Sequence, residues 1–597
     1  MPQSGPENSI LVNFTKRSTN GRKVNNLGLV EDEFAPAKIV ATQRRRNYAQ
    51  RLAELEQKSE ARNWVMMISL VLALNFYGYN MVIGNVMVKP LTKYIYHLDE
   101  KQQKEVNGQF GAFFALGFLF SSLNIGFFTK YIGRVKTMLL MEVIKIVLIL
   151  CFNIKNLNLF LALRIATGFI AGLQSAVGPL TGNEMMPKKI ALVGGGMFFF
   201  TFTLFILVAG SIHDIFGGEK GLADNWRLVL TWPIVFCFVT IIAILSTVGF
   251  SETPDYYIEN IKDEKEMKEK IFNTMKKIYT EDSAKKFIEI KLKQMIKQKK
   301  KATRTKNALY MNWKTIFSKS FRYQFIAGAL ICILKELSGN MFMLYFSTQV
   351  FDEVSGNGAQ ITLILSLGMF IGAFISIFVI QFGRRLVMLF TSFIHAISLV
   401  ALIIGIRLQD PLINSISSFF YITSFGCGLC SVLGIYVIEI MPAFGVGVTF
   451  AVQWLIVMGI GACYSYLMEA IGTALIMCIH LFFACCLFFS IYFLCYETKG
   501  HSKEEIQLIF MSGKLRADSS EVSLRIQVEK KKSKKEKREI YLEQKVGGQV
   551  VGPHGIENGK KWSIKNSVKI QAEVDRGLNG FDSDRNLVQG TTDRVVE

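Results

Sequence analysis

Long apolar stretches recur along the chain, separated by shorter polar segments. Each is roughly 20 residues long, the length that an α-helix needs to cross the ~30 Å hydrocarbon core of a bilayer. A soluble chain of 597 residues would divide into several domains with fewer apolar runs. The pattern therefore predicts an all-α membrane protein with twelve transmembrane helices, at about 64–86, 108–128, 137–154, 157–180, 190–213, 226–250, 323–345, 360–380, 386–405, 412–437, 445–468 and 471–495.

The twelve predicted helices form two sets of six, and short motifs repeat between the sets. A Gly-Arg pair follows the second helix at Gly133 and the eighth at Gly383, and a Glu-x-x-Pro follows the fourth and the tenth. Such repeats are typical of transporters whose two bundles rock around a central site. The predicted parts are an N-terminal segment (1–63), a six-helix bundle (64–250), a basic linker (251–322), a second six-helix bundle (323–495) and a basic, largely disordered tail (496–597).

The distribution of charged residues along the chain predicts how the helices are oriented across the membrane. A net charge of +21 in a soluble chain would suggest a nucleic-acid partner, whereas in a membrane protein the distribution of the charge matters more. Basic residues gather before the first helix, in the 2–3, 4–5 and 6–7 loops, and in the tail. The positive-inside rule then places both termini in the cytoplasm, and no nucleic-acid partner is expected.

The linker and the tail carry the most concentrated positive charge. The stretch from Glu264 to Lys301 has the pattern of a Lys-rich amphipathic helix, and the tail contains a basic run from Lys530 to Arg538. Both are either solvated cytoplasmic segments or contacts for anionic lipids of the inner leaflet. The expected partners are thus the lipid bilayer and a small-molecule solute, and the plasma membrane is favoured over an internal membrane.

The sequence shows no pattern that predicts a cofactor, a metal site or catalysis. All ten cysteines fall within or at the end of predicted helices, where they are expected to be small packing residues. Cys427 and Cys430 have the spacing of a metal pair, but no second pair accompanies them. Without a nucleotide loop or a nucleophile paired with a base, the sequence does not indicate an enzyme.

Several fragments, in order along the chain, together resemble the sugar-porter family of the major facilitator superfamily, whose members include facilitative hexose transporters. The resemblance covers the chain from the first helix to just past the twelfth. The fragments that carry it are Tyr77-Gly78-Tyr79-Asn80, Gly133-Arg134, Glu184-x-x-Pro187, Ser251-Glu252-Thr253-Pro254, Leu337-Ser338-Gly339 and Tyr496-Glu497-Thr498-Lys499-Gly500. It implies a transporter that works by alternating access.

The resemblance also implies a set of ion pairs at the cytoplasmic helix ends. In the family, arginines at one helix end pair with glutamates at another and latch the halves together in the outward-facing state. This chain lacks the arginine that the family usually has beyond each Glu-x-x-Pro, since Ala191 stands there after the fourth helix and a shortened Gly-rich turn, 444–447, follows the tenth. Ordinary anchoring of the loops is the alternative role for these charges. The candidate gating residues are Arg134, Glu184, Arg384, Arg385, Glu439 and Glu497.

The expected solute site departs from the family where sugars are bound. Lys335 and Glu336 stand where the family has two glutamines on the seventh helix, and neutral amides suit sugar hydroxyls better than two charges do. These replacements are expected either to change the solute or to abolish binding, so a sugar-like solute is expected and glucose is disfavoured. The candidate substrate-binding residues are Lys335, Glu336, Ser338, Asn340, Tyr345, Asn80, Gln453 and Trp454.

Lys335 and Glu336 lie about a dozen residues into the seventh helix, roughly 18–20 Å from its start. Charges at that depth need a partner or a cavity. Adjacent residues of a helix point about 100° apart, so the two are not expected to pair with each other. Two alternatives stay open, a structural ion pair with another helix or contact with the solute. Glu142 and Lys145, three residues apart on the third helix, are expected to pair.

The first helix bears on energy coupling. Proton-coupled members of the family tend to have a titratable aspartate at the position of Asn80, and an amide cannot titrate. The sequence thus favours a facilitator that moves a small polar, sugar-like solute. The alternative is a non-transporting nutrient receptor that has kept the fold and signals through its long tail.

Overall fold

The structure is a computed structural model that describes residues 54–303, 317, 321–501 and 503–512. Eleven of its helical stretches are long and apolar enough to cross a membrane. The remaining predicted span, the third at 137–154, is α5 (Arg134–Cys151). This 18-residue helix carries four charged side chains and packs beside α6 and α10. The predicted all-α fold with twelve membrane helices in two halves is confirmed. The predictions for residues 1–53 and for the tail beyond residue 512 lie outside the described residues.

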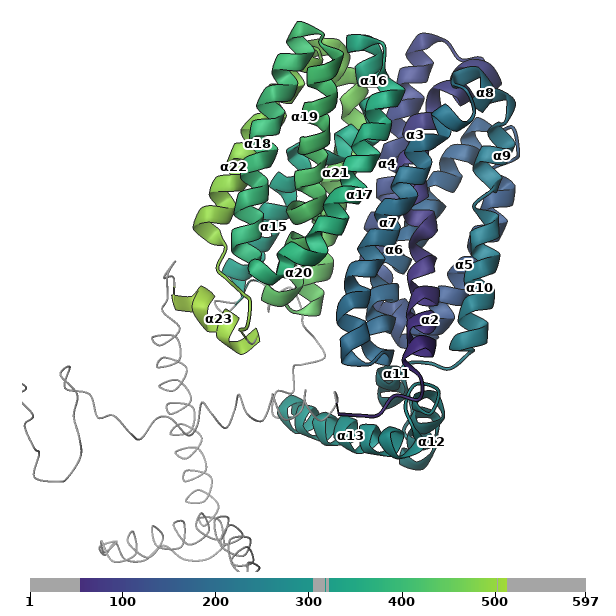
Figure 1. The fold of residues 1–597 in the computed structure, drawn as a ribbon, viewed down its shortest axis with the longest axis vertical. Helices are drawn as coiled ribbons and strands as arrows, with labels where there is room; N and C mark the ends of the chain where they lie inside the picture. The colour runs from purple at the N-terminus through teal and green to yellow at the C-terminus, as the bar shows by residue number, and fades with distance from the viewer. Residues whose placement is uncertain (1–53, 304–316, 318–320, 502, 513–597) are drawn as a thin grey trace, which may run out of the picture. The chain divides into compact units, whose positions relative to one another are not determined.

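The first bundle contains the helices coloured purple to blue in Figure 1. A capping box at Asp99 begins its second span, where the carboxylate accepts from the backbone N–H of Gln102. Its helices are α2 (Glu60–Val71) continued by α3 (Asn75–Pro90), α4 (Glu100–Phe127), α5, α6 (Leu157–Met185), α7 (Lys188–Ile215), α8 (Glu219–Asp224), and α9 (Trp226–Thr231) followed by α10 (Ile234–Thr247).

The second bundle repeats this plan, with two differences from the prediction. Its fourth span was expected to be one helix, but a π-helical segment at Phe425–Cys430 interrupts it. Its first span was expected to be one helix but is broken at Gly339 into α15 and α16. Its helices are α15 (Arg322–Leu337), α16 (Asn340–Ser355), α17 (Gly358–Val379), α18 (Arg384–Leu408), α19 (Pro411–Ser424), α20 (Ser431–Ile440), α21 (Ala443–Ile471) and α22 (Thr473–Leu494).

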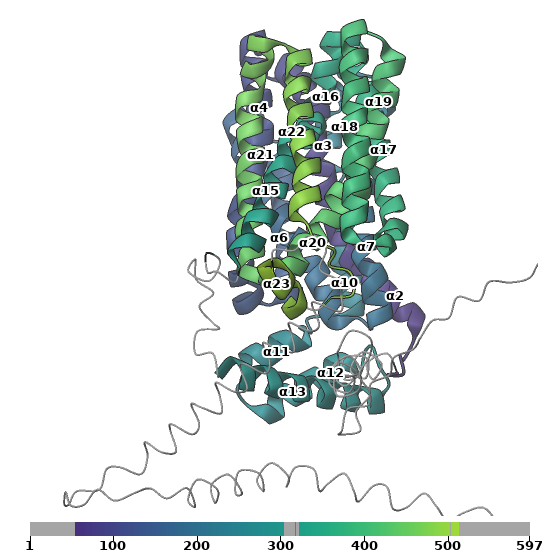
Figure 2. The ribbon, with the colours of Figure 1, turned by 90° about the vertical axis from the view of Figure 1, so that its left-hand side faces the viewer.

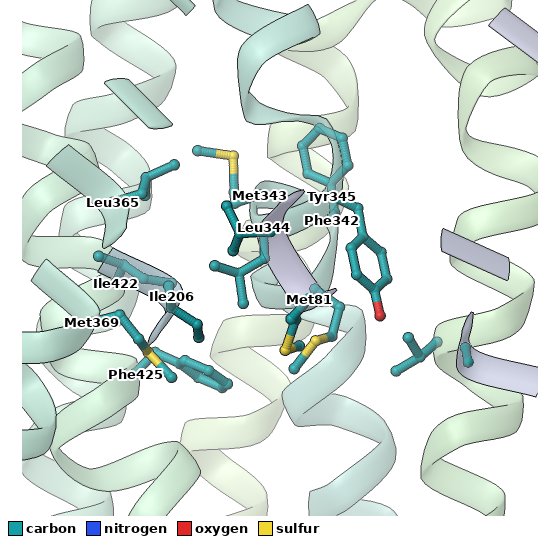
Figure 3. Packing of buried hydrophobic residues seen from close by; sticks show 14 of the residues in the cluster. Met81, Ile206, Phe342, Met343, Leu344, Tyr345, Leu365, Met369, Ile422 and Phe425 are labelled. Atoms are coloured by element: carbon teal, nitrogen blue, oxygen red, sulfur yellow. The ribbon is translucent and has the colours of Figure 1, made fainter. Parts of the chain in front are cut away.

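The two bundles share one hydrophobic core along their interface. Figure 3 shows Met81 of α3 and Ile206 of α7, from the first bundle, among Leu344, Met369 and Phe425 of the second. Helix α4 also packs along α21, and α7 packs along α17. In a transporter of the kind that the sequence resembles, the solute would bind at such an interface between the two repeats.

A small helical segment lies at one end of the bundles, which we call the linker end. It consists of α11 (Pro254–Asn260), α12 (Glu264–Met275) and α13 (Glu281–Thr303), so the Lys-rich stretch predicted as one helix is two. Lys277, between them, donates to the carbonyl of Val248 at the end of the first bundle. The helix α23 (Lys503–Ser512) packs against α15 and α20, and Figure 2 shows it at the same end. We call the opposite end, which carries α8, the far end.

Candidate functional site

Aromatic side chains from both bundles meet at the centre of the interface. The rings of Phe118 on α4 and Trp454 on α21 stack with their centroids 4.0 Å apart. The ring centroid of Tyr77 on α3 lies 4.9 Å from that of Phe118 and 4.2 Å from that of Phe202 on α7. The side chains of Phe118 and Trp454 are both buried, and their rings pack against each other across the interface. Trp454, predicted as a site residue, is therefore placed where the bundles meet.

Lys335 and Glu336 form an ion pair with each other. The Lys335 Nζ lies 2.7 Å from Glu336 Oε1, and the two side chains are 6% and 0% exposed. The expectation that they cannot pair is wrong, because the long lysine chain spans the angle between adjacent positions in the last turn of α15. The ammonium also lies 5.8 Å from the centre of the Phe425 ring.

The break after α15 is held by side chains of other helices. Gly339 adopts φ +93°, which ends α15 and leaves carbonyl groups that need donors. Ser338 Oγ and Asn340 Nδ2 donate to the carbonyl of Lys335. From outside the broken helix, the Tyr421 hydroxyl donates to the Ser338 carbonyl, and His480 Nδ1 donates to that of Leu337 at 2.7 Å. Ser338 and Asn340, predicted to bind solute, thus shape the break.

Four of the predicted site residues keep a buried polar atom without a hydrogen-bond partner among the described residues. They lie on α15, α16 and α21, of which α16 packs against α3 and α21 against α4 of the first bundle. Buried polar atoms are normally satisfied, so these four atoms can accept or donate to a solute or to ordered water. The atoms are Glu336 Oε2, Asn340 Oδ1, Tyr345 Oη and Gln453 Oε1.

Asn80 faces the interior of the first bundle. Its Oδ1 and its backbone carbonyl both accept hydrogen bonds from the guanidinium of Arg164, at 3.2–3.3 Å. Its Nδ2 donates to the carbonyl of Phe76 one turn earlier. The structure therefore places Asn80 against Arg164, whereas Lys335, Glu336, Tyr345 and the other predicted site residues belong to the second bundle.

The predicted gating residues form one matching cluster in each bundle at the linker end. Arg134 Nε lies 3.3 Å from Glu184 Oε2, and Arg384 Nη2 lies 2.8 Å from Glu439 Oε1. Each pair joins helices of the same bundle, so in this structure they brace the bundles and do not latch the halves to each other. Arg385 instead donates to the carbonyl of Tyr492.

A carboxylate holds the start of a helix in both clusters, buried in the first and half-buried in the second. Glu252, missed as a site residue, accepts three backbone N–H groups at the start of α5, from residues 134 to 136, at 2.8–3.1 Å. Glu497 accepts two at the start of α18. Gly133 and Gly383 precede these helices with φ of +108° and +117°, and a Cβ at either would meet the carboxylate within 2.7 Å. Only the surrounding motif could have indicated this role for Glu252.

At the far end, polar contacts cross between the bundles. Lys89 of α3 lies 3.1 Å from Asp352 of α16 and also pairs with Glu219 of α8. Asn85 Nδ2 donates to Ser347 Oγ at 2.9 Å. Asn85, Lys89 and Asp352 also line a cavity of about 320 Å³ among α3, α4 and α16. Sequence reasoning missed Lys89, since a lysine among acids in a loop is ordinary.

The sequence model of the family described as "Sugar (and other) transporter" matches residues 65–510, most of the chain. This chain belongs to that family. It is thus an integral membrane protein of the major facilitator superfamily and a transporter of the sugar-porter type.

Known relatives agree with this membership. The transporter is 26% identical over 434 residues to the facilitated glucose transporter member 2 of Gallus gallus, covering 68% of this chain and 76% of that protein. It is 26% identical over 292 residues to the proton myo-inositol cotransporter hmit-1.1 of Caenorhabditis elegans, covering 47% and 46%. The inward-open structure of the xylose transporter XylE from E. coli has the same fold, with a TM-score of 0.59, 17% identity, and coverage of 75% of this chain and 99% of that one.

Proposed function

We propose that the protein is a facilitative transporter that moves a small polyhydroxylated solute across the plasma membrane by alternating access. Both termini are cytoplasmic in this proposal, so the linker end faces the cytoplasm and the far end faces outside. The predicted division into a cytoplasmic segment, two bundles, a linker and a tail is kept, and α12 and α13 present lysines that suit anionic lipid headgroups.

The observation that carries the proposal is the set of unsatisfied polar atoms on the second bundle. Glu336, Tyr345 and Gln453 offer a carboxylate, a hydroxyl and an amide oxygen. The stacked rings of Phe118 and Trp454 supply an apolar surface at the same interface. Hydroxyl groups of a solute can donate to the two carbonyl-type oxygens, while its carbon face packs on the rings. This combination suits a sugar or a cyclic polyol.

The Lys335–Glu336 pair distinguishes this site from one with two glutamines. An ion pair satisfies its own charges, and so the site as a whole carries no net charge that would demand a charged solute. The pair presents an acceptor carboxylate and a donor ammonium with fixed positions. We infer a solute with several hydroxyl groups, and a selectivity that differs from that of a site with two amides.

Facilitated transport is supported by the surroundings of Asn80. This side chain accepts from Arg164 with an amide oxygen, which gains and loses no proton between pH 5 and 9. The relatives include both facilitated and proton-coupled transporters, so membership alone does not decide the coupling.

The contacts at the two ends support a state that is open toward the linker end. Ion pairs and hydrogen bonds from Lys89 and Asn85 hold the bundles together at the far end. At the linker end, the pairs of Arg134 and Arg384 stay within their own bundles. Alternating access would break the first set and bring the second set of helix ends together.

The experiment that tests the proposal is uptake by vesicles containing the purified protein. Labelled hexoses, pentoses, cyclic polyols, amino acids and organic acids are compared, with and without a proton gradient. We expect saturable uptake of one polyhydroxylated solute, unchanged by an uncoupler, and its loss in Trp454→Ala. Binding of such a solute without uptake would instead favour a receptor, and uptake driven only by the proton gradient would overturn facilitated transport.

A further inference from the structure

A buried positive charge in the first bundle lacks the partner that other buried charges have. Four cationic side chains are buried among the described residues: Arg134, Lys145, Arg164 and Lys335. Three pair with a carboxylate at 2.6–3.3 Å: Arg134 with Glu184, Lys145 with Glu142 (as predicted), and Lys335 with Glu336. The fourth, Arg164, is 2% exposed and has no carboxylate within 4.0 Å in the described part of the chain.

The guanidinium of Arg164 is held by neutral oxygens only. It donates to Asn80 through the backbone carbonyl and Oδ1, and to the carbonyl of Phe110 at 3.4 Å. The rings of Phe110 and Phe114 lie 5.6 and 4.8 Å from its central carbon. These contacts satisfy hydrogen bonds and add cation–π attraction, but they leave the full positive charge in a medium of low dielectric.

A small cavity lies beside this charge. It has a volume of about 10 Å³, roughly one water molecule, and its lining includes Asn80, Gly84 and Arg164. A Cβ on Gly84 would lie 3.2 Å from Arg164 Nη2 and 3.3 Å from the Phe110 ring, so the glycine keeps this space open. Of the five N–H groups of the guanidinium, one on Nη2 has no acceptor among the described residues.

We propose that Arg164 and this cavity form a binding site for a monatomic anion, chloride under ordinary conditions. The anion supplies the negative charge that an aspartate at position 80 would supply, and it accepts from the free N–H of Nη2. The size of the cavity excludes phosphate and any solute that carries a carboxylate.

The first test measures thermal unfolding of the purified full-length protein in sodium chloride, sodium bromide and sodium gluconate at equal ionic strength. A ligand that binds only the folded state raises the unfolding temperature, here by on the order of 2 °C, in a saturable way. We expect chloride and bromide to do so and gluconate not to. Equal unfolding temperatures in all three salts would overturn the proposal.

The decisive variant is Asn80→Asp, which places a carboxylate beside Arg164. Because this charge replaces the anion, the variant should unfold in gluconate at no lower temperature than the wild type does in chloride, and should lose the response to chloride. Arg227→Gln removes an exposed arginine of the same bundle and should keep the full response. A full response in Asn80→Asp would place the anion elsewhere and overturn the proposal.

Direct binding completes the test without relying on stability or transport. Equilibrium dialysis with radioactive chloride should find about one ion per chain, displaced by bromide and not by gluconate. Gly84→Ala, which narrows the cavity, should weaken this binding at least about tenfold. Binding to Asn80→Asp equal to that of the wild type would contradict the assignment to Arg164.

Discussion

Gly339 shows how much one residue decides in this fold. Its left-handed conformation divides the first span of the second bundle, and an added Cβ would lie 2.8 Å from the ring of His480. The same ring holds the carbonyl of Leu337 at the break. Gly356 has nearly the same backbone angles but nothing within 4 Å of an added Cβ. Comparing the same substitution at the two glycines therefore separates the cost of backbone strain from the cost of a steric clash.

We predict that Gly339→Ala destabilises the protein by about 3 kcal/mol or more, because strain and a clash with a buried ring add together. Gly356→Ala carries the strain alone and should cost about 1–2 kcal/mol. Thermal unfolding of the two purified variants measures the difference. Equal losses would mean that the ring of His480 moves aside freely.

A second prediction concerns the ion pair of Lys335 and Glu336. Lys335→Gln or Glu336→Gln alone leaves one buried charge without its partner, and should cost roughly 3–5 kcal/mol and lower the surface expression. The double change to glutamine removes both charges and should recover most of that loss. It should also change which sugars compete for uptake. A double variant as unstable as the singles would show that the pair is not the cause.

The pair also marks a limit of prediction from sequence. The depth of the two charges in the span indicated that each needs a partner. The angle of about 100° between adjacent helical positions then argued against pairing with each other. The length and flexibility of the lysine chain outweighed that geometry in the structure. The position of Asn80 against Arg164 was likewise beyond the sequence, because it depends on how three helices pack.

At the scale of elements, each bundle fixes the start of its third helix with a carboxylate from the segment after its sixth. Glu252 does this for α5, and Glu497 does it for α18. A carboxylate at a helix N-terminus meets both the free N–H groups and the positive end of the helix dipole. The repeat of Gly-Arg motifs could be predicted from the sequence, while the acceptor that completes each motif could not.

We predict that Glu252→Gln lowers the unfolding free energy by about 1–3 kcal/mol, because the amide loses the charge and turns a donor toward backbone N–H groups. Glu259→Gln is the matched control. Its side chain is 53% exposed and pairs with Arg134 at 3.2 Å, so its loss should stay below about 1 kcal/mol. Similar losses in the two variants would contradict the role of the backbone contacts.

Most helices were predictable because apolar length is a strong signal, and the exceptions have local causes. Helix α5 is less apolar than the other spans because four charged residues lie within its 18 positions. Two of them, Glu142 and Lys145, form an ion pair at 2.6 Å. The break at Gly339 left only a glycine in an apolar run as its signal. Residues 276–280, which divide α12 from α13, carry no proline or glycine to mark them.

For the whole molecule, the contacts between the bundles at the far end decide which side is open. Lys89 joins α3 to both α8 and α16. Partly exposed pairs of this kind contribute up to about 1 kcal/mol each. Together they can shift the population of two states several-fold, which is enough to alter transport without altering the fold.

We predict that Lys89→Gln opens the far end more often. A cysteine at position 345, introduced as Tyr345→Cys in a background without exposed cysteines, should react about three- to tenfold faster with a membrane-impermeant thiol reagent added outside. Lys93→Gln, an exposed lysine one turn further along, should leave the rate unchanged. No acceleration in Lys89→Gln would mean that other contacts hold this end closed.

The proposed orientation is tested with the whole chain. Basic residues alternate in density from loop to loop, so epitope tags at residue 5 and residue 590 should both be inaccessible to antibodies on intact cells and accessible after permeabilisation. Surface labelling of either tag would contradict cytoplasmic termini and would reverse which side the linker end faces.

The carboxylates that complete α5 and α18 also determine when each helix start can be completed during synthesis of the chain. The ribosome makes the chain from its N-terminus, and domains made first fold first. The start of α5 finds its acceptor once residue 252 has emerged, before any of the second bundle exists. The start of α18 likewise waits for residue 497. Each acceptor is made more than a hundred residues after the helix start that it completes, 118 for α5 and 113 for α18. The first half can therefore reach its finished form inside the membrane early, while the second half stays incomplete until its last helix has been inserted.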